Sequence, residues 1–325
     1  MTLVRVIKSW DWPDLMRQTP KHEGVWDGIQ FTLEAVDECD YVIVLNWVPT
    51  NTRVQCPSRH VWAIMQEPPI RVYRRMHRGS DAVHRVYTQD PSLQGPRYIH
   101  SHGALAWHVD RDYDYLRSCA VPDKPRALSW VTSNSKSHEG QKQRMAFLHR
   151  IEGRLEFDLW GRGFTPIPDK WDGVAPHRYS LAIENFSGPD YWTEKIADCF
   201  LSWTMPIYYG CTNIEEYFPK EALVRIDIAS PDAVRIVEET MRSDLWRRSR
   251  EAIAFARELV LEKHQFFPFV SEQIRRFESA NVGSLDPQQR EEVRLPAARP
   301  PKSPLWLRVR RRVSYLGSRV LRVGR

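Results

Sequence analysis

The chain has 325 residues and a formal net charge of +6, from 47 Lys and Arg against 41 Asp and Glu. This length exceeds one ordinary compact domain and suits two α/β domains. The charge is uneven, because residues 302–325 carry eight Lys or Arg and no acidic residue, and subtracting these eight charges from +6 leaves −2 for the rest. A near-neutral body argues against a broad nucleic-acid-binding surface and for a local anionic partner of the basic end.

Cysteine usage and hydropathy indicate the compartment. The five cysteines are widely spaced, odd in number and without a CxxC motif, which is typical of reduced thiols in a cytoplasmic protein. The first residues, MTLVRVIKSWDWPD, contain too short an apolar run for a signal peptide. We therefore expect a cytoplasmic protein that does not cross a membrane.

The first part of the chain predicts strands separated by short connections. Residues 3–7, 41–47, 60–66 and 83–89 are rich in β-branched or aromatic residues and are bounded by Pro, Gly, Asn or Asp. Between them, residues 31–38 are expected to form a short helix. This alternation predicts a mostly parallel sheet in an N-terminal domain over residues 1–120.

A second alternation follows the proline-containing segment 118–126. Strands are expected at 127–133, 156–160, 179–183, 205–210 and 222–228, and helices at 141–151, 193–203, 231–242 and 244–263. We expect a C-terminal domain over residues 121–277. The predicted fold class is α/β, with two Rossmann-like domains that face each other across a cleft.

The end of the chain differs in composition. Residues 278–304 are Pro-rich and polar and are expected to form a linker. Residues 305–325 place apolar side chains at spacings of three and four with arginines between them, which predicts a basic amphipathic tail weakened by Gly317. Peripheral docking on anionic lipid, a disordered solubilising tail and unspecific RNA binding all fit this pattern.

Several charged and polar residues flank one turn, in the segment YSLAIENFSGPDYWTEKIADCF (179–200). Glu184 and Asn185 follow an expected strand, and Thr193, Glu194 and Lys195 begin an expected helix. A helix N-terminus is already positive, so a lysine there suits an anion, such as a phosphate, bound between them. The alternative is that Lys195 extends into water while Glu194 complements the helix dipole.

The string LAIENFSGPDYWTEKIADCFLSWTMPIYYGCTNIEEYFP (181–219) resembles the donor-binding signature of glycosyltransferase family 10, the α1,3/4-fucosyltransferases. Upstream, Ser133-Asn134, Arg144 and the segment 158–161 also stand where the family pattern asks. The resemblance covers residues 127–230 well and is faint before them. It is closest in kind to the soluble bacterial type, which lacks an N-terminal membrane anchor.

The resemblance implies a GT-B-type enzyme that moves fucose from GDP-fucose to a hydroxyl of a glycan or glycolipid acceptor with inversion. It requires no tightly bound cofactor, and no motif in the chain indicates a metal or a specific nucleic-acid partner. Arg144 and Lys195 would neutralise the diphosphate. The other implied donor-binding residues are Glu184, Asn185, Tyr191, Thr193 and Glu194.

Inverting transfer needs a carboxylate that takes the proton of the acceptor hydroxyl. Glu67, in the strand-end segment MQEPP, resembles the general base of the family. Asp90, in YTQDP, is a rival base, and Glu67 could instead be an ordinary turn residue.

Some residues depart from the family pattern or suggest other functions. Phe186 and Trp192 replace family residues where the donor sugar is expected, so another GDP- or NDP-sugar is an alternative. A non-catalytic glycan- or nucleic-acid-binding module is an alternative of another class. Asp112 and Asp114 form a DxD pattern, which in some glycosyltransferases binds a metal, but a pattern this short arises often by chance. His100, His102 and His108 lack the spacing of a metal site, although His102 or His108 could line the acceptor cleft.

Overall fold

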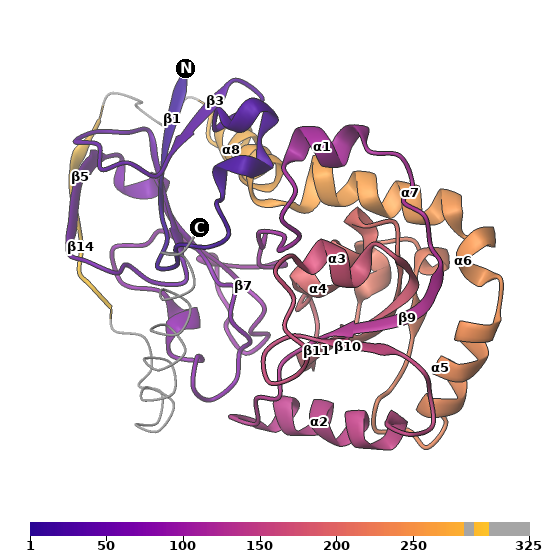
Figure 1. Cartoon of the computed structure of the whole chain (residues 1–325). Helices are drawn as coiled ribbons and strands as arrows, with labels where there is room; N and C mark the ends of the chain where they lie inside the picture. Colours follow the sequence, from indigo (N-terminus) through magenta and orange to yellow (C-terminus); the bar gives the residue numbers. More distant parts are fainter. Residues whose placement is uncertain (283–288, 299–325) are drawn as a thin grey trace, which may run out of the picture.

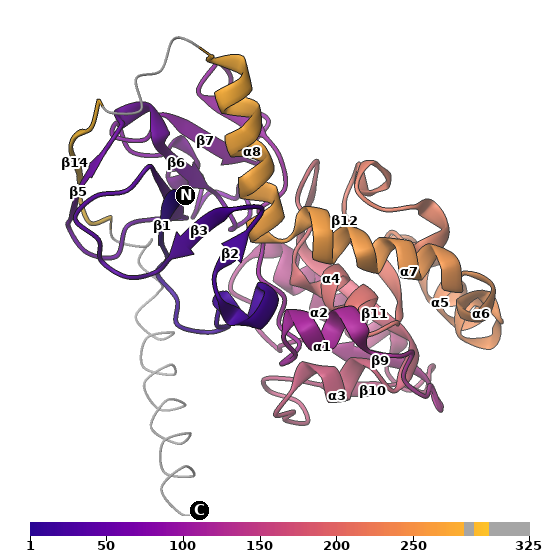
Figure 2. The ribbon, with the colours of Figure 1, turned by 90° about the horizontal axis from the view of Figure 1, so that it is seen from above.

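The computed structural model describes residues 1–282 and 289–298. Two parallel sheets form two domains that lie side by side, and the chain crosses from the first to the second and back (Figures 1 and 2). The expected α/β fold with two Rossmann-like domains is therefore present. The residue ranges expected for the two domains remain a prediction. Helix α8 and strand β14, described below, come late in the chain and pack on the first domain.

The first sheet has the strand order β2-β3-β1-β4-β6-β7-β8, parallel except for the β2–β3 pair. Its strands are β1 (Thr2–Ile7), β2 (Val25–Trp26), β3 (Ile29–Thr32), β4 (Tyr41–Leu45), β6 (Val61–Ile64), β7 (Arg85–Thr88) and β8 (Tyr98–His100). The four predicted strands are present, but the predicted helix at 31–38 is wrong. Residues 29–32 alternate between buried and half-buried positions as β3, because Phe31 packs into the core.

Helix α8 (Phe266–Ala280) covers one face of this first sheet, as Figure 2 shows. The ring of Phe31 lies 5.0 Å from that of Phe267, and the ring of Trp62 lies 5.3 Å from that of Phe277. Most of α8 falls within the range 121–277 expected for the second domain, yet its apolar face packs on the first. The amphipathic pattern of a helix does not specify which sheet the helix covers.

The opposite face of the first sheet is covered by a two-stranded antiparallel sheet of β5 (Thr52–Cys56) and β14 (Glu291–Leu295). Val54 and Val293 from this pair join Val42 and Val44 in a second apolar cluster. Residues 291–295 were expected to be linker and instead form a strand. Val293 and Leu295, two residues apart on one face of the strand, are buried. Two apolar residues in a Pro-rich polar segment are too short a pattern to predict a strand.

The second sheet has the order β10-β9-β11-β12-β13 and is parallel throughout. Its strands are β10 (Asp158–Trp160), β9 (Arg126–Val131), β11 (His177–Gly188), β12 (Met205–Cys211) and β13 (Val224–Arg225). Helix α2 (Glu139–Ile151) lies on one side of it, and α3 (Lys170–Val174) and α4 (Glu194–Leu201) lie on the other (Figure 1). Sheet and helices thus place β11 at the centre of the domain.

The remaining α-helices lie before and after the second sheet in the chain. Helix α1 (Tyr113–Ser118) precedes β9, and α5 (Ala233–Arg242), α6 (Leu245–Arg248) and α7 (Arg250–Leu259) follow the second sheet. A π-helical turn at Val260–His264 then leads into α8. The predicted helix at 244–263 is therefore divided into shorter segments.

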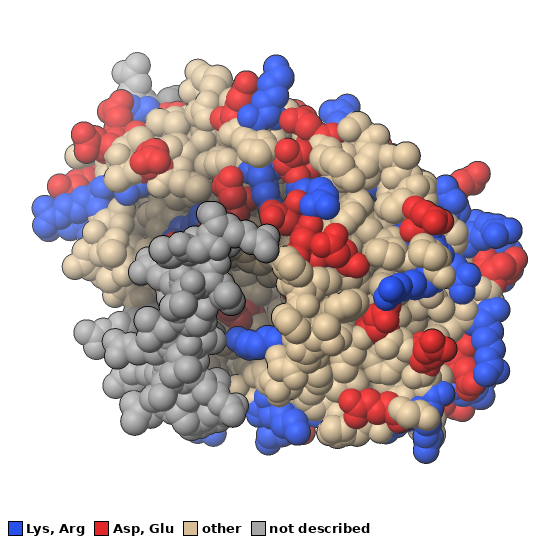
Figure 3. Space-filling model, in the orientation of Figure 1, with Lys and Arg blue, Asp and Glu red and all other residues tan. Residues whose placement is uncertain are grey.

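Figure 3 shows acidic and basic side chains interspersed over one face of the protein, as a near-neutral body implies. Within residues 1–282 and 289–298, every helix is too short or too polar to span a lipid bilayer. The predicted tail at 305–325, and the parts 283–288 and 299–304 of the predicted linker, lie outside the described residues.

Candidate active site

The carboxyl ends of strands from both sheets face a cavity of about 290 Å³. The first domain contributes residues that follow β4 and β6, and the second contributes residues of late β11 and the start of α4, as expected for parallel sheets. Six predicted site residues line it: Glu67, Asn185, Tyr191, Thr193, Glu194 and Lys195. Trp12, Asn46, Gln66 and His108 are further lining residues. The fold therefore brings the predicted base to the same cavity as the turn at 184–195.

Glu184 lies beneath the cavity wall and is fully buried. Its Oε1 accepts hydrogen bonds of 2.8 Å from both the backbone N–H and the hydroxyl of Thr193, and its Oε2 lies 3.0 Å from Nζ of Lys195. Burial raises the pKa of Glu184, while the Lys195 charge opposes that rise. Glu184 thus joins β11 to the first turn of α4 and neutralises part of the lysine charge.

The sequence predicted that Glu184 directly follows a strand. In the structure it lies within the strand, because β11 continues to Gly188. The pairing of β11 with β12 is irregular between Ile183 and Gly188, so the regular ladder is interrupted in the stretch that contains this glutamate. Gly210 on β12 has a φ of +155°, and a Cβ there would lie 2.4 Å from Cγ of Glu184. Only glycine leaves room for this side chain.

Lys195 is held between two carboxylates and does not simply extend into water. Its Nζ lies 3.3 Å from Oε1 of Glu194 and 2.8 Å from the hydroxyl oxygen of Thr193. Burial alone would lower the pKa of Lys195, but Glu184 and Glu194 outweigh burial and raise it. Burial would raise the pKa of Glu194, whereas Lys195, His108 and Lys170 together lower it. Both side chains are therefore charged at neutral pH.

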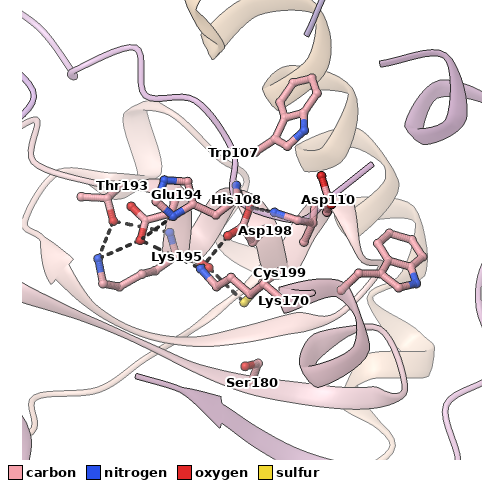
Figure 4. A network of polar contacts seen from close by, with 12 residues as sticks. Trp107, His108, Asp110, Lys170, Ser180, Thr193, Glu194, Lys195, Asp198 and Cys199 are labelled. Atoms are coloured by element: carbon pink, nitrogen blue, oxygen red, sulfur yellow. Dashed lines mark hydrogen bonds and ion pairs between the residues drawn. The ribbon is translucent and has the colours of Figure 1, made fainter. Parts of the chain in front are cut away.

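Two residues that the sequence did not single out, Lys170 and Asp198, support this pair together with His108 (Figure 4). Nζ of Lys170 lies 2.5 Å from Oδ2 of Asp198 and 3.9 Å from Oε1 of Glu194. Oδ1 of Asp198 accepts a 2.8 Å hydrogen bond from the backbone N–H of His108, which ties α4 to the segment between the domains. An aspartate four residues after Glu194 in an apolar helix is a sequence signal for a buried ion pair, whereas Lys170 carries no such signal.

Arg144 lies on α2 and is buried. One guanidinium nitrogen lies 3.5 Å from the hydroxyl oxygen of Ser133, and Nε has no hydrogen-bond partner within the described residues. Burial lowers the pKa of Arg144, and the negative charges of Glu184 and Glu194 oppose this. Arg144 does not line the cavity of Glu67 and Lys195, but a buried guanidinium with this little hydrogen bonding can bind an anion placed beside it.

Helix α2 approaches β11 so closely that its second residue must be glycine. A Cβ on Gly140 would lie 1.8 Å from the carbonyl oxygen of Asn185. The α2 N-terminus, with its free N–H groups, therefore lies directly beside the cavity residue Asn185. A second cavity, of about 430 Å³, opens here between α2, late β11 and the segment after Ile70.

Backbone hydrogen bonds fix the position of Glu67. Oδ1 of Asn46 accepts from the N–H groups of Gln66 and Glu67 at 2.7 and 3.2 Å, and the Glu67 carbonyl accepts from Nε2 of His77 at 2.9 Å. Asn46 has a φ of +65°, a strained conformation for a residue other than glycine. The segment that carries Glu67 is thus more constrained than an ordinary turn.

Asp90, the rival base, is not among the residues that line this cavity. Its Oδ1 accepts from the backbone and the hydroxyl of Ser92 at 3.0 and 2.6 Å, and Oδ2 lies 3.3 Å from Nε of Arg74. These bonds to Ser92 and Arg74 outweigh burial and lower the pKa of Asp90. Its environment is that of a structural carboxylate.

Trp192 and Phe186 have different surroundings. The sequence placed Trp192 where the donor sugar is expected. In the structure Trp192 is instead buried against His102, with ring centroids 4.8 Å apart, and does not face the donor cavity. Phe186 lines the second cavity, with its ring 5.4 Å from that of Tyr191. The hydroxyl of Tyr191 donates to Oδ1 of Asn185 at 2.8 Å. Of the two departures from the family pattern, Phe186 is the one at a cavity wall.

The DxD and histidine patterns have structural surroundings. Oδ1 of Asp112 caps α1 by accepting from the N–H of Tyr115 at 2.8 Å, and Asp114 accepts from the N–H of Lys21 at 2.7 Å. Across residues 1–282 and 289–298, no group of three His, Cys, Asp or Glu side chains is placed to hold a metal ion. His108 lines the cavity, and His102 lies in the core between the domains.

Residues 121–235 match the sequence profile described as glycosyltransferase family 10 (fucosyltransferase), C-terminal. The chain resembles glycosyltransferase family 10. The matched range includes every predicted site residue except Glu67.

Relatives of this kind extend over more of the chain. A 3-galactosyl-N-acetylglucosaminide 4-alpha-L-fucosyltransferase of Pongo pygmaeus is 25% identical in an alignment over 256 residues, and the match covers 72% of this chain and 66% of that protein. A 4-galactosyl-N-acetylglucosaminide 3-alpha-L-fucosyltransferase of Homo sapiens is 26% identical over 257 residues, with the same coverages of 72% and 66%. The chain thus spans slightly less than two thirds of the length of these relatives. A crystal structure of an alpha1,3-fucosyltransferase superposes with a TM-score of 0.47 at 14% identity, over 82% of this chain and 91% of that one.

Proposed function

We propose that this protein is an inverting glycosyltransferase that moves fucose from GDP-fucose to a hydroxyl of a glycan acceptor. The observation that carries the proposal is the family 10 match over residues 121–235, together with a cavity in which Glu67 of one domain faces Glu194 and Lys195 of the other. A non-catalytic binding module is not favoured, because binding alone does not require a carboxylate such as Glu67 opposite a positively charged site for an anion.

In the proposed reaction, Glu67 accepts the proton of the acceptor hydroxyl as the oxygen of that hydroxyl bonds to C1 of the sugar. The bond between C1 and the phosphate oxygen breaks, and its electron pair leaves with GDP. Arg144, Lys195 and the N-terminus of α2 stabilise the negative charge that develops on the diphosphate. Asn46 and His77, which hold the backbone of Glu67, act as positioning residues.

Donor contacts follow from the same geometry. Asn185 and Tyr191 line the cavity and present amide and hydroxyl groups to the sugar or nucleoside. Glu184 and Thr193 act mainly through Lys195, because both side chains bond to its ammonium group.

A related function uses the same site with another GDP- or NDP-sugar, and Phe186 at the cavity wall favours it. We also propose that the protein is bacterial and cytoplasmic and contacts anionic membranes through residues 305–325. The charge pattern of the sequence supports this location.

The first experiment is thermal unfolding of the full chain with GDP, GDP-fucose, UDP and CMP. A ligand at a thousand times its dissociation constant stabilises a protein by about 4 kcal/mol, which gives a clear shift in Tm. We expect GDP and GDP-fucose to raise Tm, and UDP and CMP not to. Lys195→Ala should raise the Kd for GDP at least about tenfold through loss of a charge-assisted contact, whereas Lys220→Ala, an exposed lysine of the same domain, should not.

Two results would contradict the proposal. One is equal stabilisation by all four ligands or by none. The other is unchanged GDP affinity in a folded Lys195→Ala protein, which would remove the lysine from the donor site. A transfer assay with several nucleotide sugars would then separate fucose from the alternative donors.

A further inference from the structure

The first domain contains a groove that the proposed reaction does not use. Its volume is about 430 Å³, and its lining includes Val44, Ala63, Met65, Val72, Met76 and Val83, hereafter the apolar groove. It lies on the sheet face opposite α8, between β4, β6 and the segment after Ile70. Burial of a hydrocarbon chain against such side chains is favourable at about 25 cal/mol per Å².

The apolar groove is a neighbour of both cavities of the candidate active site and shares one lining residue with each. Asn46 lines both the groove and the cavity that holds Glu67, and Val72 lines both the groove and the cavity beside α2. Val72 is 51% exposed, which is unusual for a valine and leaves apolar surface open at the junction. The groove and the cavity of Glu67 are therefore separated by little more than the Asn46 side chain, so a long ligand held in the groove ends close to the reacting carboxylate.

The rim of the apolar groove is strongly basic. The segment RVYRRMHR (71–78) has four arginines and no acidic residue. Arg71, Arg75 and Arg78 are exposed, and none forms an ion pair with a carboxylate of the described residues. Arg75 lines the groove, and Arg71 lines the neighbouring cavity. Unpaired guanidinium groups beside an apolar surface suit a ligand that is both anionic and apolar.

We propose that the apolar groove holds the hydrocarbon part of an amphiphilic acceptor and that Arg71 and Arg75 bind its phosphate. That the ligand is the acceptor rests on the proposed glycosyl transfer, whereas the site for a lipid phosphate does not. The basic segment 302–325 is a poorer occupant, because its eight positive charges would meet the arginines of the rim. The substrate class is thus a glycan carried on a lipid phosphate.

Binding tests the site directly, using the full chain and dodecyl phosphate below its micelle concentration. We expect saturable binding that inorganic phosphate at equal concentration does not displace. The double variant R71E/R75E should weaken it at least tenfold. The matched control R154E/R247E reverses two exposed arginines of the other domain that have no ion pair among the described residues, and it should bind as the natural chain does.

Each other result overturns the inference. Equal affinity in R71E/R75E would exclude the rim, and equal binding of inorganic phosphate would indicate an anion site without a lipid groove. Loss of binding on removal of residues 302–325 would assign the lipid to that segment. The variant Ser80→Trp, which fills the groove from its exposed edge, should also weaken binding, and unchanged affinity in it would exclude the groove even if R71E/R75E fails to fold.

Transfer assays test the acceptor role. With GDP-fucose, galactosyl-N-acetylglucosamine linked to dodecyl phosphate should have a KM at least tenfold below that of the free disaccharide, and R71E/R75E should close this gap. Equal KM values in the natural chain would overturn the acceptor role. Lipid-phosphate binding without GDP binding or transfer would contradict the proposed function but support the lipid site. GDP binding and transfer without lipid-phosphate binding would support the proposed function but contradict the lipid site.

Discussion

Lys195 shows how a cation can be kept at a helix N-terminus. The helix dipole disfavours it, and burial adds a further cost, yet Glu184 and Glu194 lie within 3.0 and 3.3 Å of its ammonium nitrogen. Arg144, by contrast, is a buried cation with no ion pair among the described residues. We infer that a diphosphate would complete the charge balance at Arg144 and would share Lys195 with its carboxylates.

Glu67 and Asp90 give a prediction at the same scale. Glu67→Gln should lower kcat for transfer by about 10²- to 10⁴-fold, the usual contribution of a general base, and should leave the GDP-induced rise in Tm intact. Asp90→Asn should lower stability by about 1–2 kcal/mol through its buried bonds to Ser92 and Arg74, with little change in kcat per folded molecule. The measurements are initial rates and urea unfolding; the opposite pattern would make Asp90 the base.

Helix α2 and strand β11 behave as one unit, because the helix N-terminus touches the carbonyl group of Asn185. Glycine inside a helix ordinarily costs about 1 kcal/mol relative to alanine. At Gly140 the geometry reverses this preference, since a Cβ would lie 1.8 Å from a backbone oxygen that cannot rotate away. Close approach of the helix to the strand is therefore maintained at this position by the absence of a side chain.

Gly140→Ala should consequently destabilise the protein by about 1–3 kcal/mol, the usual cost of overpacking, and should weaken GDP binding as α2 moves away from the cavity. Urea unfolding and a GDP titration measure the two effects. Lys142→Ala, at an exposed site on the same helix, is the matched control and should change stability by less than about 0.5 kcal/mol. Stabilisation by Gly140→Ala would show that the helix is not held against β11.

At the scale of the whole molecule, an aromatic cluster fastens the two domains together. His264, in the turn before α8, lies 5.2 Å from the ring of His102 and 5.8 Å from that of Trp192. Its Nε2 donates to the carbonyl group of Tyr217 at 3.1 Å. Burial lowers the pKa of His264 to about 4, with Lys263 acting in the same direction, and burial also lowers the pKa of His102.

Acid should therefore loosen this junction. The unfolded chain binds a proton at His264 near pH 6.5 and the folded chain near 4, so stability is lost as the pH falls between these values. The full shift corresponds to about 3 kcal/mol. Urea unfolding at pH 7 and pH 4.5 should show a smaller loss in His264→Gln than in the natural chain, whereas the exposed His149→Gln should show the natural loss. An equal loss in both variants would exclude His264 as a cause.

The sequence predicts the two alternating α/β segments, the chemistry of residues 184–195 and the family resemblance, because periodicity and a dense local motif are properties of neighbours in the chain. It also singles out Glu67. Packing in three dimensions settles the rest: α8 and β14 return to the first sheet, Trp192 lies in the core, and Lys170 and Asp198 join His108 in supporting Glu194. These facts depend on contacts between residues far apart in sequence, where an amphipathic helix or a lone charged residue has several possible partners and packing selects one.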